Sequence, residues 1–521
     1  MRARSLVRAS AALFVVTAAL SAAPAAHASP RAVPAGDSSN TSAVPVIVEA
    51  AGATAARDAV VAAGGTVGLS LPIVGGVAAD VDATTLAALE GNPSVSVTPD
   101  ATLHATSGSF QPTKSKASDA SALDPQIGAI GAAGEWSPDA GHGIAVALVD
   151  TGVADTPDLH GPRLVRGPDF SGEGDGIDHY GHGTFMAGLI AGDGSASAGS
   201  AAHHVGVAPG ATIVSVKVSG ADGSTSVSRV IAGIGWVVTH GDQYGIGVLN
   251  LSFGVPAPMP YWANPLSAAV EAAWASGITV VVSAGNNGAN VTSPGSDPYV
   301  VTVGAVDTAG TVTTADDSVT SWSGHESFPG YAKPDVAAPG VSVYSLRAPG
   351  STVDTTHPEG RVGSVYFRGS GTSMATALVS GAAAVLLSHH PYATPDDVKG
   401  ALVDGSVTIH GGHEVNLEAA DHATPQPDWW QHYRVAFNGL GRGFDHGMPW
   451  TATRWTASRW TASRWTASRW TATRWTASRW TETEWAASRW TASRWTATRW
   501  TSTRWSATRW SAEAWPSQGW G

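Results

Sequence analysis

The sequence predicts a large α/β domain with a parallel sheet, a small α+β unit before it and a low-complexity segment after it. Residues 124–420 alternate apolar runs with helical stretches, residues 43–104 alternate shorter strands and helices, and from Trp450 a five-residue unit repeats. Long alternation of this kind is typical of parallel strands wrapped by helices, which place a functional site at the carboxyl ends of the strands.

The strands of the large domain are predicted from near-continuous apolar runs, because strands buried on both faces lose the usual alternation of polar and apolar residues. Five such runs are GIAVALVD, ATIVSVKV, GIGVLNLS, GITVVVSAG and YVVTVGAV. Helices are expected between them, among others over 183–192, 226–240 and 265–275.

The small unit over 43–104 reads as strand, helix, strand, strand, helix, strand. AVPVIVEA is the first strand, and the helix TAARDAVVAAGG stops at Gly64, since glycine is the usual residue after a helix end. Asp82 is the expected N-cap of the second helix. This order predicts a compact ferredoxin-like module.

The first residues have the three features of an export signal. They contain three arginines in the first eight positions, an apolar run over 11–23 that is too short to span a bilayer, and the small-residue triplet AHA at 26–28. We therefore expect a signal peptide over 1–28 and a secreted protein. No later segment is predicted to cross a membrane.

Three polar segments separate the predicted units. Residues 29–42 form a Ser/Pro/Ala-rich linker, and residues 105–123 are Ser-rich, as a cleavable connector would be. Residues 421–449 link the large domain to the repeat.

Composition and charge exclude some chemistry and divide the chain in two. There is no cysteine, so disulfides, thiol nucleophiles and thiolate metal sites are excluded. The segment from Trp450 has 11 Arg and 3 Glu, a balance of +8, so the rest of a chain with net charge −12 carries −20. An acidic body and a basic tail predict separate roles for the two parts.

Four polar residues stand where the chain leaves an apolar run or begins a helix. Asp150 ends the run VALVD, His182 lies between glycines in DHYGHGTFMAG, Asn286 follows VVVSAG, and Ser373 begins an Ala-rich helix in GTSMA. Taken singly, they suit a strand-end turn, a loop histidine, a turn residue and a helix N-cap. Together they favour nucleophilic catalysis, because a serine needs a base, a group to orient that base and a donor for the oxyanion.

Six motifs, VALVDTGV, HGTFMAG, VLNLSFG, SAGNNG, KPDVAAPG and GTSMA, resemble the series found in the subtilisin-like serine protease family (peptidase S8) and occur in its order. The resemblance covers residues 124–420. It implies a three-layer catalytic domain and a secreted endopeptidase that cleaves polypeptides through an acyl-enzyme intermediate. No cofactor is required for the chemistry, structural calcium is an option, and a monomer is expected.

The resemblance also implies roles for individual residues. Ser373 is the nucleophile, His182 the general base and then acid, Asp150 the carboxylate that orients His182, and Asn286 the oxyanion donor. No metal ligand is predicted. Asp178 is left open between a substrate-side charge and a plain loop carboxylate. Residues expected to bind substrate come from two segments and are Ser252, Phe253, Gly254, Ser283, Ala284 and Gly285.

The small unit resembles the inhibitory propeptide of the same family, an intramolecular inhibitor that assists folding and then occupies the cleft. Two departures from the family pattern stand out. The segment 191–211 is short of carboxylates for the family's calcium loop, and an insertion within 345–368 could be a lid or a solvated hairpin, the latter being favoured.

Two other functions stay open at this point. One is a dedicated processing peptidase that matures one partner peptide, with the insertion restricting access. The other is an envelope-binding protein whose protease fold is catalytically idle.

The segment 450–521 is a Trp/Arg pentapeptide repeat that holds 15 of the 22 tryptophans. A period of five gives no single apolar stripe on a helix or a strand, so a core of its own is not expected. On a helix, each Trp could pair with the Arg four residues later. The segment is interpreted either as a contact to an anionic cell-envelope surface or as a largely disordered extension.

Overall fold

The computed structural model describes the small unit, the large domain and the backbone of the repeat. The described residues are 43–104, 125–199, 203–256, 259–288, 290–423, 431, 436, 450–462, 465–482, 485–502 and 505–514. The predictions of a signal peptide over 1–28, a linker over 29–42 and a connector over 105–123 lie outside the described residues, as does most of the linker over 421–449.

The small unit is an antiparallel sheet of order β2-β3-β1-β4 with two helices and a valine-rich core of its own. Asp82 caps its second helix by accepting a hydrogen bond of 2.7 Å from Thr85 N, and Gly64 ends the first with φ +93°. The elements follow the predicted order: β1 (Val44–Glu49), α1 (Ala53–Ala63), β2 (Thr66–Leu71), β3 (Gly76–Val81), α2 (Ala83–Glu90) and β4 (Ser96–Pro99).

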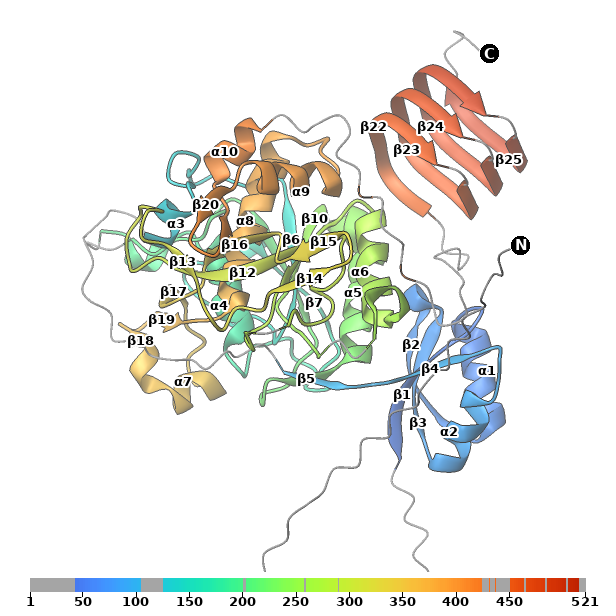
Figure 1. Cartoon of the computed structure of the whole chain (residues 1–521), viewed down its shortest axis with the longest axis horizontal. Helices are drawn as coiled ribbons and strands as arrows, with labels where there is room; N and C mark the ends of the chain where they lie inside the picture. Colours follow the sequence, from blue (N-terminus) through green and yellow to red (C-terminus); the bar gives the residue numbers. More distant parts are fainter. Residues whose placement is uncertain are drawn as a thin grey trace, which may run out of the picture. The chain divides into compact units, whose positions relative to one another are not determined.

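The large domain is built on a mostly parallel sheet of order β20-β21-β16-β12-β11-β10-β6-β8-β7, with β13 beside β12 (Figure 1). The five predicted apolar runs are its five neighbouring strands β12, β11, β10, β6 and β8. The bounds are β6 (Ala145–Asp150), β7 (Leu164–Asp169), β8 (Thr212–Lys217), β10 (Ile246–Leu251), β11 (Thr279–Ser283), β12 (Val301–Asp307), β13 (Ser318–Val319), β16 (Val336–Pro339), β20 (Val407–Ile409) and β21 (Gly412–Glu414).

Two pairs of helices and the sheet make the three layers of this domain. The helices α4 (His182–Ala191) and α8 (Thr372–His389) pack on each other, and so do α5 (Val227–Tyr244) and α6 (Pro265–Ala275); both pairs contact the central strands. The fold class predicted from the sequence is therefore confirmed. Shorter helices are α3 (Pro125–Ala129), α7 (Thr352–Thr356), α9 (Pro395–Asp404) and α10 (Leu417–His422).

The helix α8 runs through the core of the large domain. Its residues from Thr372 to Leu387 are buried. Among the described residues it is the one helix long and apolar enough to cross a bilayer, but that property here reflects its position inside the protein.

The end of the small unit contacts the large domain. Strand β5 (Thr102–His104) pairs antiparallel with β9 (Ser224–Ser226). The Asp100 carboxylate accepts hydrogen bonds of 2.8 and 2.6 Å from the backbone N–H and the hydroxyl of Ser228, in the first turn of α5. A negative side chain is favourable at the positive end of a helix.

The insertion predicted within 345–368 is folded and docked. Strands β17 (Val343–Leu346), β18 (Arg361–Val362) and β19 (Tyr366–Gly369) form a small antiparallel sheet. Thr352 N and Val353 N, in the helix that joins them, donate 2.9 Å hydrogen bonds to the carbonyls of His179 and Tyr180. The favoured expectation of a solvated hairpin was wrong, because its backbone bonds to the segment just before His182.

The repeat forms strands that pair in parallel at an offset of twenty residues, or four repeats. Trp450 pairs with Trp470, Trp465 with Trp485, and likewise Arg with Arg. The described part of the repeat is therefore not helical, and the helical Trp–Arg pairing is not the arrangement found. The strands are β22 (Trp450–Ala462), β23 (Trp465–Glu482), β24 (Trp485–Ser502) and β25 (Trp505–Ala514).

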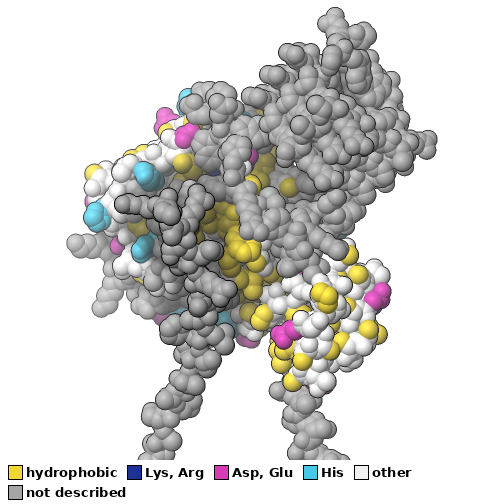
Figure 2. Space-filling view, turned by 45° about the vertical axis from the view of Figure 1, so that its right-hand side comes forward, with side chains coloured by type: hydrophobic (Ala, Val, Ile, Leu, Met, Phe, Trp, Pro, Cys, Tyr) yellow, Lys and Arg dark blue, Asp and Glu magenta, His cyan; other side chains and the backbone are white. Residues whose placement is uncertain are grey.

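One face of the described part of the chain shows the sign of its surface charge. On the face drawn in Figure 2, acidic groups are more evident than lysine or arginine. This agrees with the negative balance that the sequence assigns to the chain before Trp450.

Candidate active site

Asp150 and His182 meet inside the large domain. Asp150 is the last residue of β6, and His182 is the first residue of α4. His182 Nδ1 lies 2.8 Å from Asp150 Oδ1, and both side chains are almost completely buried. Because a carboxylate accepts, Nδ1 carries the proton, which leaves His182 Nε2 as the basic nitrogen. That nitrogen is buried and has no hydrogen-bond partner among the described residues.

A glycine lets these two elements approach. Gly183 follows His182, and a Cβ at this position would collide with the carbonyl of Gly152 and lie 3.2 Å from Asp150 Oδ1. No other residue fits here without moving the strand end away from the helix.

Asp178 holds the start of α4 in place. Its Oδ1 accepts hydrogen bonds from Tyr180 N, Gly181 N and the Thr151 hydroxyl, and its Oδ2 accepts from the N–H and hydroxyl of Thr184. Burial raises the pKa of Asp178, and these hydrogen bonds oppose the rise. Neither interpretation offered for Asp178 is right, since the carboxylate is buried and positions the helix that carries His182.

Lys217 supports the same region from the neighbouring strand. It lies opposite Asp150 in the register of β6 and β8 and is fully buried. Its Nζ donates to the carbonyls of Thr151 at 2.8 Å and Ile177 at 2.7 Å, and pairs with Glu173 at 3.0 Å. The ammonium thus ties the turn after Asp150 to the loop before His182.

Sequence reasoning missed Thr151, Thr184 and Lys217 as positioning residues. Thr184 Oγ1 accepts a hydrogen bond of 2.9 Å from Ala154 N, and Thr151 Oγ1 accepts one of 2.8 Å from Gly183 N. Both threonines stand within the motifs DTG and HGT, and Lys217 is a charge at the end of a buried run. Polar residues at such places were a signal that pattern analysis could have used.

Asn286 contacts the residue next to Ser373. Its Oδ1 accepts hydrogen bonds of 2.9 Å from both the N–H and the hydroxyl of Thr372. This fixes the amide so that its Nδ2, the donor, points away from Thr372. Ser373 is fully buried in the first turn of α8, where backbone N–H groups lack intrahelical acceptors.

The environment of His182 sets its basicity. Burial alone would lower the pKa of His182, but the charge and hydrogen bond of Asp150, with a further contribution from Asp178, raise it above the ordinary value of 6.5. A more basic imidazole accepts a proton from a hydroxyl more readily.

The two segments predicted to bind substrate face each other across Thr292. A Cβ on Gly254 would collide with the Thr292 hydroxyl, and one on Gly285, which has φ +99°, would lie 2.8 Å from Thr292 Cγ2. The Ala284 carbonyl already accepts from Thr292 N at 3.1 Å, and the Gly285 carbonyl from Gly324 N at 2.8 Å. Thr292 therefore shapes the space between the segments. Substrate binding by the six residues stays a prediction.

The loop after α4 does not fit a calcium ion. Its nearby carboxylates are already engaged, since Asp193 Oδ2 accepts from Arg163 at 2.6 Å. Asp158 Oδ1 accepts from Ala196 N at 2.7 Å, and its Oδ2 from the Tyr366 hydroxyl at 2.7 Å. The described residues leave no free carboxylate oxygen pair for a divalent cation in this loop.

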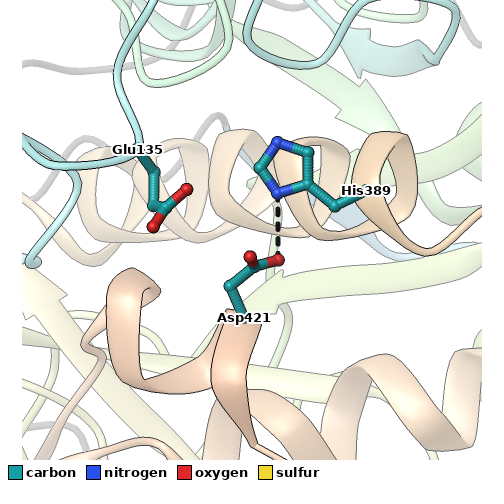
Figure 3. Close-up of side chains that lie close together, drawn as sticks. All are labelled: Glu135, His389 and Asp421. Atoms are coloured by element: carbon teal, nitrogen blue, oxygen red, sulfur yellow. Dashed lines mark hydrogen bonds and ion pairs between the residues drawn. The ribbon is translucent and has the colours of Figure 1, made fainter.

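Two other clusters have the composition of a metal site, and neither includes Asp150, His182, Asn286 or Ser373. In Figure 3, Glu135, His389 and Asp421 turn toward one another, and His389 Nδ1 lies 3.0 Å from Asp421 Oδ1. His389 is the last residue of α8 and Ser373 lies in its first turn, so about 24 Å along the helix axis separate the two. The second cluster is exposed and consists of Glu173, Asp175 and His179.

Comparisons with known proteins agree with this architecture. A family model described as the subtilase family matches residues 141–426. Serine protease AprX of Bacillus subtilis is 39% identical over 53% of this chain and 66% of its own, and Subtilisin Savinase of Lederbergia lenta is 35% identical over 54% of this chain and 91% of its own.

Among solved structures, fervidolysin from Fervidobacterium pennivorans, described as a keratinolytic enzyme related to subtilisin, superposes with a TM-score of 0.58 at 25% identity. The match covers 75% of this chain and 63% of fervidolysin. The chain thus spans slightly less than two thirds of the length of AprX and of fervidolysin.

Proposed function

Because the chain belongs to the subtilase family, we propose that it is a secreted serine endopeptidase whose triad is Asp150, His182 and Ser373. The observation that carries the proposal is the buried Asp150–His182 pair, which leaves a basic His182 Nε2 without a partner among the described residues. Asn286, fixed beside Ser373 through Thr372, supplies the donor for the oxyanion.

The chemistry follows from these positions. The Ser373 hydroxyl attacks the peptide carbonyl while His182 Nε2 takes its proton, and the new C–O bond turns the carbonyl oxygen into an oxyanion that Asn286 Nδ2 stabilises. His182 then gives the proton to the leaving amine, and the C–N bond breaks. Water, deprotonated by the same imidazole, releases the acyl group from Ser373.

The small unit is proposed to be the inhibitory propeptide of this enzyme. Its last strand, β5, pairs with β9 in a two-stranded antiparallel sheet, as an extended peptide does when it pairs with a strand of its partner. Leu103 is buried, and Asp100 anchors the segment on α5. Chain continuing past His104 leads into the predicted connector 105–123, where cleavage would separate the inhibitor.

A fluorophosphonate probe tests the proposed function. Reaction of such a probe with the native, processed protein is expected to modify Ser373 alone, because only an activated serine hydroxyl attacks the phosphorus. Peptide mapping by mass spectrometry identifies the site, and protein unfolded before labelling is the control. Modification of a different serine, or equal labelling of the unfolded chain, would contradict the assignment.

A dedicated processing peptidase remains a second candidate because of the docked insertion. The helix α7 bonds to the carbonyls of His179 and Tyr180, directly before His182, so it borders the proposed site. Asp354, buried within the insertion, pairs with Arg347 and Arg361 and stiffens it. Digestion of an unfolded protein, with mapping of the cuts, separates a general endopeptidase from one restricted to few sequences.

The repeat tail is proposed to hold the enzyme at an anionic cell-envelope surface. Deletion of residues 450–521 is expected to leave hydrolysis of a short peptide unchanged but to release the protein from cells into the medium. Cell fractionation followed by immunoblotting measures the distribution, with the full chain as control. Continued association of the truncated protein with cells would remove the basis for a tether.

A further inference from the structure

Arg163 occupies the centre of an oxygen cluster formed by the segment after β6, the end of α4 and the loop that follows α4. Its guanidinium donates to three backbone carbonyls and one carboxylate. These acceptors are Ala191 O at 2.9 Å, Pro209 O at 2.9 Å, Asp158 O at 2.8 Å and Asp193 Oδ2 at 2.6 Å. The Ala191 carbonyl belongs to the last turn of α4, which carries the negative end of the helix dipole and favours a cation.

A second cation lies in a similar cluster and, unlike the partly exposed Arg163, is buried. Lys399 in α9 is 3% exposed, and five oxygens surround its Nζ. They are Pro298 O at 2.6 Å, Val300 O at 3.0 Å, Tyr299 O at 3.3 Å, Asp335 Oδ1 at 3.0 Å and Gln431 Oε1 at 3.1 Å.

Asp335 connects this cluster to another lysine. Lys333 Nζ donates to Asp335 Oδ2 at 2.7 Å and to the Val300 carbonyl at 2.8 Å. Burial would raise the pKa of Asp335, but the two lysines hold it below its ordinary value. The carboxylate therefore stays charged between the two lysine side chains, and burial lowers the pKa of Lys333 to about 7.

Both clusters have the donor set that hard metal ions prefer. Calcium is bound in proteins by six to eight oxygens, mainly carboxylates and backbone carbonyls. Converging carbonyl oxygens inside a protein need a positive partner, since a buried polar group without one is costly. In this chain the positive partner is a side chain of the protein itself, Arg163 in one cluster and Lys399 in the other.

We propose that Arg163 and Lys399 replace structural calcium in this protein, so that its folded state is stable without the ion. The calcium that the family resemblance offered as an option then has no role here. The reason is physical: a guanidinium or ammonium satisfies the oxygens at all times, whereas a bound ion leaves them unpaired whenever it dissociates.

The first experiment measures thermal unfolding of the full chain carrying Ser373→Ala, which prevents self-digestion. Dialysis against EDTA is expected to leave Tm unchanged relative to buffer with millimolar calcium. A fall of Tm in EDTA that calcium reverses would overturn the proposal.

The second experiment converts the Arg163 cluster into an ion site. Arg163→Ala leaves the carbonyls and Asp193 around an open space that water and calcium can enter, so its Tm in EDTA is expected to fall. Calcium at about one hundred times its Kd is expected to restore about 5 to 10 °C. Arg163→Lys keeps a cation in the cluster and is expected to show no calcium response.

Each outcome with the variants Arg163→Ala and Arg163→Lys either supports or contradicts the replacement of calcium. A calcium response confined to Arg163→Ala supports the replacement. An Arg163→Ala protein that folds when calcium is present and does not fold in EDTA supports it equally. A folded Arg163→Ala protein that ignores calcium contradicts it. If that variant does not fold under either condition, the EDTA measurement on the Arg163-containing chain decides alone.

Discussion

Replacing Ser373 with alanine is expected to lower kcat by about 10⁶-fold and to abolish self-cleavage in the connector 105–123. The magnitude is the one known for loss of the triad serine in subtilisin, which belongs to the same family. Hydrolysis of a chromogenic peptide and the mass of the purified chain measure the two effects.

In the proposed mechanism the loss is large because both His182 and Asn286 act through the Ser373 oxygen. His182 Nε2 is a base only toward a proton that lies within its reach, and the Asn286 amide can stabilise only an oxyanion that forms beside Thr372. Without the Ser373 oxygen no covalent intermediate forms. The oxyanion donor and substrate binding still stabilise direct attack by water, which accounts for a residual rate above that of the uncatalysed reaction.

Ser380 provides a matched control on the same helix. It is also buried in α8, and its hydroxyl donates 2.9 Å to Asn250 Oδ1, so Ser380→Ala removes an equivalent group at a place with no proposed catalytic role. This variant is expected to keep kcat within a few-fold of the unmodified enzyme. Equal losses in the two variants would mean that helix packing, and not the nucleophile, explains the effect.

The central sheet could be predicted from the sequence because strands buried on both faces are apolar at nearly every position. VALVD, TIVSVK and VLNL follow this pattern, and each became a strand in the middle of the sheet. The order of the strands could not be predicted. Strand β6 lies between β8 and β10, and this arrangement depends on how the connecting helices pack on the sheet.

The residues of the candidate site could be predicted from the sequence, but the side chains that hold them in position could not. Asp150 and His182 stand at a strand end and a helix start, the places where function is expected, and the structure brings them together. The role of Asp178 could not be read from the sequence, because an acid in a Gly-rich loop looks the same whether it faces solvent or is buried under a helix. Four of its five donor groups lie two to six residues further along the chain, and the fifth is the hydroxyl of the distant Thr151, so what the sequence does not show is the burial of the carboxylate.

The two cations were invisible for the same reason. Arg163 and Lys399 lie in ordinary polar segments, GPRL and PDDVKG, and nothing local marks them as surrounded by oxygens. Their acceptors are mainly backbone carbonyls, which every residue has, so no side-chain pattern can reveal the cluster. The strands of the repeat could not be predicted for a different reason. A period of five is compatible with a helix or a strand, and only the structure shows that strands twenty residues apart pair with identical residues opposite each other.

Replacing Asp150 with asparagine is expected to lower kcat by about 10⁴-fold and to move the acid limb of the kcat/KM profile to lower pH. The neutral amide no longer favours the proton on His182 Nδ1, so the ring loses its catalytic tautomer for part of the time. It also removes the charge that raises the pKa of His182 above 6.5, while burial, which lowers that pKa, remains.

The sign of the pH shift follows from which form of His182 is active. The imidazole must be neutral to take the proton from Ser373, so activity is lost as pH falls through the pKa of His182. In the unmodified enzyme that pKa is raised, and the acid limb lies above 6.5. In Asp150→Asn the same loss begins at a lower pH, because a ring without a carboxylate partner is protonated only in more acid solution.

Asp155 supplies the matched control for this variant, because Asp155→Asn makes the same change five residues further on, where the side chain is 86% exposed and pairs with Arg166. It is expected to leave both kcat and the acid limb unchanged. An Asp150→Asn enzyme whose acid limb stays in place would show that another group controls the profile. A rate loss below tenfold would show that the buried carboxylate does not orient the base, and the triad would then have to be assigned to other residues.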